Sequence, residues 1–323
     1  MGFHFCTLFD SNYLIKGVTM IRSLQKYCPS ASIYVLCMDT NCEEVLSELS
    51  LTNVHLIPLS DLEDSELLQV KKQRGVAEYC WTLSPCLPYY VLEKYQHVEF
   101  ITYLDADLFF YSSLEPLFQE IGRASIAIIE HRFTSRLKDQ EIKGRFCVEW
   151  VSFRRDTEGL ACLKRWREQC IEWCFYRLEE GKMGDQKYLD PWPEQYANCH
   201  ILMHQGAGIA PWNYPQYLIS GDANSSALIN GDPLIFYHFH QFQILENGKF
   251  DRLSSFYTEE APAPDLIYSP YESAINETIG TVHLMYPNFL AGFKSSNSVF
   301  ARRFAQKFLP SSVKRFLQKF MRY

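Results

Sequence analysis

Two aspartates separated by one residue, Asp105-Ala106-Asp107, directly follow the apolar stretch 100–104. If that stretch is a strand, side chains at i and i+2 point the same way, so both carboxylates can reach one ion at the strand's end. Two adjacent carboxylates are costly unless a cation neutralises them. Oxygen ligands suit Mg²⁺ or Mn²⁺ on the phosphates of a nucleotide. The pair therefore predicts a metal-assisted phosphate site at the carboxyl edge of an α/β sheet.

A second polar segment, Asp10-Ser11-Asn12-Tyr13, follows the first apolar stretch of the chain. One interpretation is structural: Asp10 or Ser11 caps the next helix by accepting hydrogen bonds from its free N–H groups. The other interpretation is a nucleotide pocket, in which Tyr13 stacks on the base and Asp10 reads an N–H edge. The two are compatible, because a helix cap at a carboxyl edge lies where nucleotides bind.

A third candidate is Gly184-Asp185-Gln186, which follows a long helical pattern and a turn. Gly-Asp can simply cap the helix that comes next. Alternatively, Asp185 offers an acceptor and Gln186 a donor for the hydroxyl groups of a sugar. The three residues alone do not decide between these interpretations.

Two histidines alternate at the end of the apolar stretch 233–239. On a strand, His238 and His240 share one face. A histidine is more often a structural residue than a ligand, but beside an aspartate pair either one could complete a metal site. Imidazole next to two carboxylates favours Mn²⁺ while still permitting Mg²⁺. We take His238 as the ligand and His240 as the second choice.

The elements that must position these residues alternate between strand and helix patterns over the first hundred residues. Repeated βα units of this kind predict a parallel sheet with helices on both faces. The predicted strands are 3–9, 33–38, 54–58 and 98–104, with helices over 14–24, 43–49, 66–72 and 78–94, the last one kinked or started by its prolines. Further on, we predict strands over 125–130 and 145–153, a long helix over 158–179, and a loop-rich stretch to 245.

Composition sets limits on the class of protein. The 323 residues are 47% apolar, enough for a large core, and no apolar run is long enough to span a bilayer. Because the chain opens directly on a strand pattern, without a leader-like segment, we expect it to stay in the cytoplasm. Its eleven cysteines are scattered among apolar positions and predict free buried thiols. The net charge of −7 is acidic, and we expect no nucleic-acid partner.

The last stretch differs from the rest of the chain. Residues 300–323 carry seven basic and no acidic side chains, with Phe300, Phe304 and Phe308 at helical spacing. This helix could pack on the domain with its charges facing water. Large aromatics on one face and only Lys or Arg on the other are, however, typical of an interfacial helix on anionic lipid. We predict that the segment holds the protein at the inner face of the cell membrane.

Taken in order, these segments resemble a nucleotide-diphospho-sugar glycosyltransferase of the GT-A fold, and in particular the retaining enzymes of glycosyltransferase family 8 and related bacterial sugar transferases. The segment 10–13 with 20–24 is similar to the family's nucleotide-binding strand and helix. The segment 103–107 resembles its metal motif, 184–186 its acceptor loop, and His238 its third metal ligand. The resemblance covers roughly residues 3–245.

The resemblance implies an α/β fold of the GT-A type, with a Rossmann-like mixed sheet flanked by helices; the sequence pattern adds a C-terminal amphipathic helical tail. We therefore divide the chain into a catalytic domain 1–245, an irregular extension 246–298 and a membrane-associating tail 299–323. The catalytic domain has a nucleotide-binding half 1–110 and an acceptor half 111–245. The residues that it implies for the nucleotide are Thr7, Asp10, Asn12, Tyr13, Arg74, Asp105, Ala106 and Asp107.

The implied reaction moves a hexose from a nucleotide sugar, UDP-linked by preference, to a glycan or lipid-linked acceptor, with Mn²⁺ or Mg²⁺ held by Asp105, Asp107 and His238. Retention could come from front-face attack assisted by Gln186, with Asp185 orienting hydroxyl groups, which we favour, or from a covalent intermediate on Asp185 or Glu149. The setting would be the synthesis of surface polysaccharide or lipopolysaccharide.

Some positions depart from the family's pattern. The arginine expected in the helix near residue 80 is missing, and Arg74 or Lys71 could replace it. The segment after His238 lacks the glycine and the phosphate-binding lysine, and Cys147-Val148-Glu149 stands where an Asn-Val-Gly motif is expected. Two other readings stay open: a sugar-phosphate nucleotidylyltransferase, which should open with a Gly-rich phosphate loop absent here, and an inactive nucleotide-sugar-binding protein of the same fold.

Overall fold

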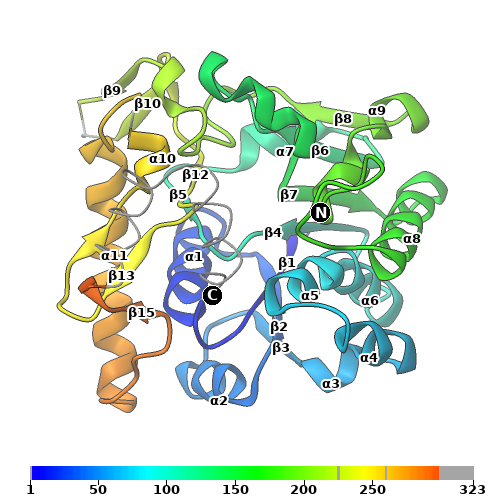
Figure 1. Ribbon diagram of the computed structural model, residues 1–323, viewed down its shortest axis with the longest axis horizontal. Coiled ribbons are helices and arrows are strands. Elements are labelled where there is room, and N and C mark those ends of the chain that lie inside the picture. The colour runs from blue at the N-terminus through cyan, green and yellow to red at the C-terminus, as the bar shows by residue number, and fades with distance from the viewer. Residues whose placement is uncertain (1, 224–225, 259, 298–323) are drawn as a thin grey trace.

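The computed structural model describes residues 2–223, 226–258 and 260–297, which form an α/β protein around a seven-stranded sheet (Figure 1). The strand order is β3-β2-β1-β4-β7-β6-β8, and only β7 runs against the others. The strands are β1 His4–Phe9, β2 Ser32–Cys37, β3 Val54–Pro58, β4 Phe100–Leu104, β6 Ile126–Glu130, β7 Phe146–Arg154 and β8 Cys199–Leu202. The sheet is therefore mixed, as predicted.

The parallel half of the sheet brings two of the candidate segments together. β1 pairs in parallel with β4, Phe5 opposite Thr102 and Cys6 opposite Tyr103. β4 is buried along its whole length and β1 along all but its first residue, which explains their continuous apolar sequences. Because parallel strands end at one edge of a sheet, the loop 10–13 after β1 emerges beside the aspartate pair after β4.

Helices cover both faces of the sheet, each over a hydrophobic core of its own (Figure 1). Adjacent residues of β1 serve opposite cores, Phe5 the first and Cys6 the second. The first core is covered by α1 Leu14–Tyr27, α2 Thr40–Leu49 and α7 Glu115–Ile121. The second is covered by α3 Leu59–Leu62, α4 Ser65–Lys71, α5 Val76–Leu83, α6 Cys86–Lys94, α8 Thr157–Glu172 and α9 Trp192–Gln195.

A short ribbon next to the main sheet positions the histidines. β5 (Leu108–Phe110) follows the aspartate pair and pairs in antiparallel fashion with β12 (Phe236–His238). In this register His238 lies opposite Leu108, the residue that directly follows Asp107. The register therefore determines which of the two histidines reaches the aspartates. Smaller sheets contain β9 Ile219–Gly221, β10 Ala227–Ile229 and β11 Asp232–Pro233, and β13 Gln243–Leu245, β14 Phe250–Asp251 and β15 Phe293–Lys294.

Two predicted helices have different bounds in the structure. The helix predicted over 78–94 is two helices, α5 and α6, and Pro85 stands immediately before α6, as the proline signal indicated. The helix predicted over 158–179 ends at Glu172, because Trp173 adopts extended dihedral angles. The following residues approach the site instead of continuing the helix.

The segment 246–298 was expected to be irregular, and this expectation is wrong for much of its length. It contains α11 (Asp265–Met285), 21 residues long, whose Tyr268, Tyr271 and Ile275 are fully buried in the first core. Pro270 inside the helix obscured the pattern, although the apolar spacing is helical. The short helix α10 (Ser255–Thr258) precedes it. The predicted tail, 299–323, lies outside the described residues.

All eleven cysteines are free, and nine of them are buried, as predicted. Within the described residues, no helix combines the length and apolar character that crossing a bilayer requires.

Candidate functional site

The aspartate pair and His238 meet at the end of β4. His238 Nε2 lies 3.0 Å from Asp107 Oδ1 and 3.9 Å from Asp105 Oδ2. One ligand atom from each of the three residues lies within 4.8 Å of the others. The backbone fixes this arrangement, since Asp105 N donates to Glu149 O over 3.3 Å and Phe239 N donates to Asp107 O over 2.9 Å. Two carboxylates and one imidazole form a donor set that fits Mn²⁺ or Mg²⁺.

Burial and mutual charge set the protonation of this group. Burial, partly opposed by His238, raises the pKa of Asp105 to about 7, and the charge of Asp107 adds to the rise. Burial also disfavours ionised Asp107, but the contact with His238 outweighs it and lowers the pKa of Asp107. For His238, burial opposes the charged form, but Asp107, and after it hydrogen bonds with Cys147 and Glu149, raise its pKa well above the usual value. Without a metal the cluster thus holds a shared proton, which a cation can replace.

His240 lies close by but does not reach the aspartates as His238 does. Its ring packs edge-on against Trp212 and His238, with centroids 5.5 and 5.7 Å away. Burial and the charge of His238 lower its pKa to about 4, so it is neutral in the folded protein. Of the two histidines left open by the sequence, the structure brings His238 within ligand distance of the pair.

The loop after β1 is held in place by its own side chains. Asp10 accepts hydrogen bonds from Tyr13 N over 3.1 Å and from Asn12 Nδ2 over 2.9 Å. Ser11 does not cap α1; its N–H and hydroxyl both donate to Asp39, which itself caps α2. The Tyr13 side chain is 42% exposed, with the ammonium of Lys16 4.5 Å from its ring centroid. Asp10 therefore shapes the loop, and Tyr13 offers a free ring face.

Asp185 and Gln186 lie in the same cleft as the aspartate pair. Asp185 is buried at the start of a 3₁₀ turn, and burial together with the charge of Asp105 raises its pKa to about 7. The Gln186 amide donates to Lys143 O over 3.1 Å, which leaves its side-chain oxygen available. Gly184 has a φ of +55°, in the left-handed region, and packs against Trp81.

Two predicted nucleotide contacts do not line the cleft. Thr7 is 1% exposed within β1, inside the sheet rather than at its edge. The Arg74 guanidinium donates to Ile171 O over 3.1 Å and lies 3.9 Å from the ring centroid of Phe175. These contacts attach Arg74 to the end of α8, so its geometry gives no support to a role at the phosphates. The other predicted residues, Asp10, Asn12, Tyr13, Asp105, Ala106, Asp107, Asp185, Gln186, His238 and His240, all line the cleft.

The cleft has a volume of about 1420 Å³ and contains residues that the sequence did not single out. Lys16 lies next to it, buried under Tyr13. Burial lowers the pKa of Lys16, Asp107 opposes that effect, and Lys294 adds to it, so the charge of Lys16 interacts with both Asp107 and Lys294. Exposed rings of Tyr176 and Phe256 line the opening.

Lys294 reaches the cleft from the C-terminal segment. It belongs to β15, which pairs in parallel with β13, Leu245 opposite Lys294. β13 closely follows His238 in the sequence, at the segment that lacks the expected lysine. Lys294 therefore lies beside the segment that lacks the expected lysine, but it comes from the neighbouring strand β15. No local sequence signal could have found it, because the pairing joins distant segments.

Two proteins of Bacillus subtilis (strain 168) are similar to this chain over nearly their whole length. The uncharacterized protein YfnD is 33% identical over 307 residues, which cover 94% of this chain and 98% of YfnD. The uncharacterized protein YfnF is 32% identical over 300 residues, covering 91% of this chain and 98% of YfnF. No protein-family model matches the chain.

Among solved structures, the glycosyltransferase GlyE of Streptococcus pneumoniae TIGR4 is similar in fold. The TM-score is 0.50 at 16% sequence identity, with 87% of this chain and 64% of that chain covered. At this identity the similarity concerns the fold alone. Together with the mixed, helix-flanked sheet it confirms the predicted α/β fold of the GT-A type.

Proposed function

The chain belongs to the family of the Bacillus subtilis proteins YfnD and YfnF, and we propose that it is a metal-dependent glycosyltransferase that uses a nucleotide sugar, preferably UDP-linked. One observation carries the proposal: Asp105, Asp107 and His238 converge beside the Tyr13 loop in one cleft. A divalent-ion donor set next to an exposed aromatic ring, with Lys294 in the cleft and Lys16 beside it, suits a nucleoside diphosphate.

The donor's base and phosphates have separate contacts in this proposal. The exposed ring of Tyr13 stacks on the base, since every base offers a flat face. Lys16 and Lys294 supply positive charge to the diphosphate. Asp105, Asp107 and His238 would hold Mn²⁺ or Mg²⁺, which when bound neutralises the charge of the diphosphate as it leaves.

Retention by front-face attack agrees best with the carboxylates available. The acceptor oxygen bonds to the anomeric carbon on the side from which the diphosphate leaves, and its proton passes to the departing phosphate oxygen. Glu149 is a poor nucleophile because it is fully buried and occupied by His238, 2.6 Å away. Asp185, whose pKa is raised to about 7, is only partly ionised at neutral pH, and its protonated form can donate to a hydroxyl oxygen instead. The free oxygen of Gln186 can accept from the acceptor hydroxyl.

Aromatic surface lies at the opening of the cleft, where we place the acceptor. Tyr176 is 48% and Phe256 45% exposed at the opening, where rings of this kind can pack on the apolar face of a sugar. A cleft of this size has room for a hexose of the donor and for part of an acceptor. We therefore assign the acceptor to the glycans or lipid-linked sugars, as in the synthesis of surface polysaccharides.

Isothermal titration of UDP and UDP-sugars, with and without Mn²⁺, tests the proposal. UDP should bind the wild-type protein more tightly with Mn²⁺, and Asp107→Asn should remove that gain. Asp232→Asn, an exposed aspartate of β11 that does not line the cleft, is the matched control and should change nothing. Binding that ignores both the metal and Asp107 would refute the transferase assignment.

Product analysis separates the rival activities. Release of UDP that depends on an added glycan acceptor supports transfer. Release of pyrophosphate from UTP and a sugar phosphate would instead identify a nucleotidylyltransferase. Tight, metal-dependent binding with no turnover on any acceptor of a panel would favour an inactive nucleotide-sugar-binding protein.

A further inference from the structure

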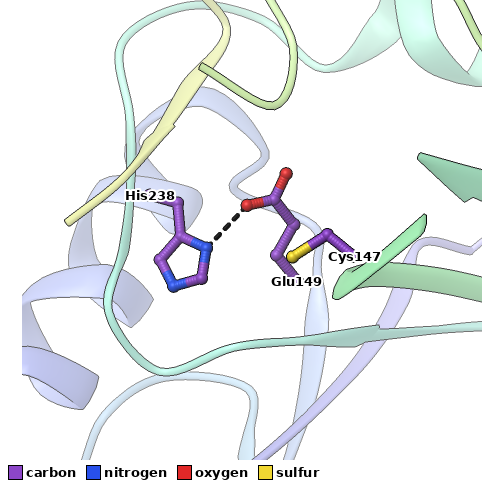
Figure 2. Close-up of side chains that lie close together, drawn as sticks. All are labelled: Cys147, Glu149 and His238. Carbon is purple, nitrogen blue, oxygen red and sulfur yellow. Dashed lines mark hydrogen bonds and ion pairs between the residues drawn. The ribbon is translucent and has the colours of Figure 1, made fainter. Parts of the chain in front are cut away.

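Glu149 lies directly behind the candidate metal site. It comes from β7 and is fully buried, and its Oε2 lies 2.6 Å from Nδ1 of His238 (Figure 2). Its other carboxylate oxygen, Oε1, has no hydrogen-bond partner among the described residues. Burying an ionised carboxylate costs free energy unless a partner group stabilises its charge. The His238 imidazole is the partner that this carboxylate has.

The two nitrogens of His238 therefore face different groups. Nε2 points to the aspartates, 3.0 Å from Asp107 Oδ1, and Nδ1 points to Glu149. A neutral imidazole carries one proton, and the nitrogen without it is the one that can bind an ion. Because Glu149 can only accept when ionised, it holds the proton on Nδ1 and leaves the Nε2 lone pair directed toward Asp105 and Asp107.

Glu149 is enclosed on two sides, at its backbone and at its carboxylate. The carbonyl oxygen of Glu149 accepts from Asp105 N over 3.3 Å, so the same residue contacts two of the proposed ligands. On the far side is Gly208, where an added Cβ would lie 3.0 Å from Glu149 Oε1. Gly208 also has a φ of +64°, so the chain allows this close approach with a residue that has no side chain.

We propose that Glu149 is a positioning residue, which orients His238 and fixes its tautomer for the ion held with Asp105 and Asp107. The inference rests on the proposed metal site. Glu149 would touch neither ion nor substrate. Carboxylates that accept from the distal nitrogen of a metal-bound histidine raise the ligand's basicity and hold its ring in place.

Cys147 offers an alternative arrangement around the same histidine. Atoms of Cys147, Glu149 and His238 lie within 4.8 Å of one another, so these three could themselves hold an ion (Figure 2). That ion would need Nδ1, which would move the proton to Nε2 and disable the aspartate site. Two ligands about 2.1 Å from one tetrahedral ion lie roughly 3.4 Å apart. The observed 2.6 Å between Oε2 and Nδ1 is too short for this and fits a hydrogen bond.

Titration of Mn²⁺ into the UDP-bound full-length protein tests the inference without relying on turnover. Glu149→Leu should weaken Mn²⁺ binding by about 10- to 100-fold. Glu149→Gln should recover most of the affinity, because its amide oxygen can still accept from Nδ1. Cys147→Ser, on the same strand, keeps a hydrogen-bonding group beside His238 and should stay within about twofold of wild type. If Glu149→Leu does not fold, Glu149→Asp, whose shorter side chain lengthens the contact, takes its place.

Nitrogen NMR of ¹⁵N-histidine-labelled protein with Mg²⁺ and UDP reads the tautomer directly. His238, identified by the signals lost in His238→Gln, should carry its proton on Nδ1 in the wild type. A proton on Nε2, or unchanged Mn²⁺ affinity in both Glu149→Leu and Glu149→Asp, would overturn the positioning role.

The titration also separates this inference from the function on which it rests. Mn²⁺ binding by the wild type that Asp107→Asn abolishes, with no effect of Glu149 variants, overturns the positioning role alone. Absence of Mn²⁺ binding in the wild type overturns the metal site as well. A loss in Cys147→Ser as large as in Asp107→Asn would assign the ion to the Cys147 side of the histidine.

Discussion

Gly292 packs against the backbone of Asn12, so that a Cβ at position 292 would lie 2.0 Å from the Asn12 carbonyl oxygen. This contact joins the C-terminal segment that carries Lys294 to the loop after β1. With a φ of +82°, Gly292 also adopts a conformation that side chains disfavour. The cleft is thus completed by residues of the segment 246–298, which the sequence analysis placed outside the catalytic domain.

Gly292→Ala should therefore destabilise the protein and loosen the cleft. The left-handed backbone costs about 1 kcal/mol, and displacement of the Asn12 carbonyl adds roughly 1–3 kcal/mol. Urea unfolding measures the loss of free energy, and UDP titration should show weaker binding. Gly248→Ala is the matched control, since Gly248 has a φ of +75° but no atom within 4 Å of its Cβ position. Equal losses in the two variants would show that the contact with Asn12 is unimportant.

Asp185 predicts an unusual pH dependence of stability. Burial and Asp105 raise its pKa in the folded protein to about 7, against about 4 in the unfolded chain. Between these values the folded state binds the extra proton, so this group's contribution to stability falls as the pH rises from 4 to 7 and is constant above that. At pH 8 the ionised carboxylate costs on the order of 4 kcal/mol at most.

Asp185→Asn removes this cost, so the variant should be more stable than the wild type at pH 8. At pH 5, where the wild-type carboxyl group is protonated in the folded state, the gain in stability should be much smaller. Urea unfolding at both pH values measures the difference, with exposed Asp232→Asn as the control. Turnover should fall, because the amide cannot replace the carboxyl group in orienting hydroxyls. A stability gain that is the same at both pH values would exclude titration of Asp185 as its cause.

The parts of this site that are local in sequence could be predicted, and the parts that depend on distant pairing could not. The aspartate pair was identifiable because an apolar strand runs straight into it. The choice between His238 and His240 depends on the register of β12 against β5, which no local pattern encodes. Lys294 gave no signal, because its place in the cleft comes from β15 pairing with β13.

The fold shows the same division. Strands and helices of the first hundred residues followed their apolar periodicity closely, since buried parallel strands have a strong sequence pattern. The 21-residue helix α11 was missed because Pro270 interrupts a pattern that tertiary packing on α1 nevertheless stabilises. Arg74 was assigned to the phosphates by resemblance alone, and its stacking on Phe175 depends on how α8 ends.

Lys294→Ala should weaken the binding of UDP by about tenfold or more, because a charge-assisted contact to a phosphate is worth roughly 1.5–3 kcal/mol. Uridine, which has no phosphate, should bind the variant and the wild type equally. The same titrations with exposed Lys249→Ala, in the neighbouring β13–β14 turn, control for the loss of one positive charge. Equal losses for UDP and uridine would place Lys294 elsewhere than at the phosphates.

Removal of residues 300–323 should separate membrane attachment from nucleotide binding. The segment carries seven basic and no acidic residues, and its aromatic residues recur at helical spacing. Each Lys or Arg near an anionic surface contributes about 1 kcal/mol, so the truncated protein should lose its affinity for anionic vesicles by many orders of magnitude at low salt. Sedimentation with phosphatidylglycerol vesicles measures this, and zwitterionic vesicles serve as the control.

The wild type should also be released from the vesicles by added salt, because the attraction is screened within about 10 Å at 0.1 M. UDP and Mn²⁺ affinities should not change, since the described residues between 8 and 294 already supply the proposed metal ligands, Tyr13 and Lys294. Vesicle binding that survives the truncation would show that the tail is not the anchor, and loss of UDP binding would show that it belongs to the catalytic fold.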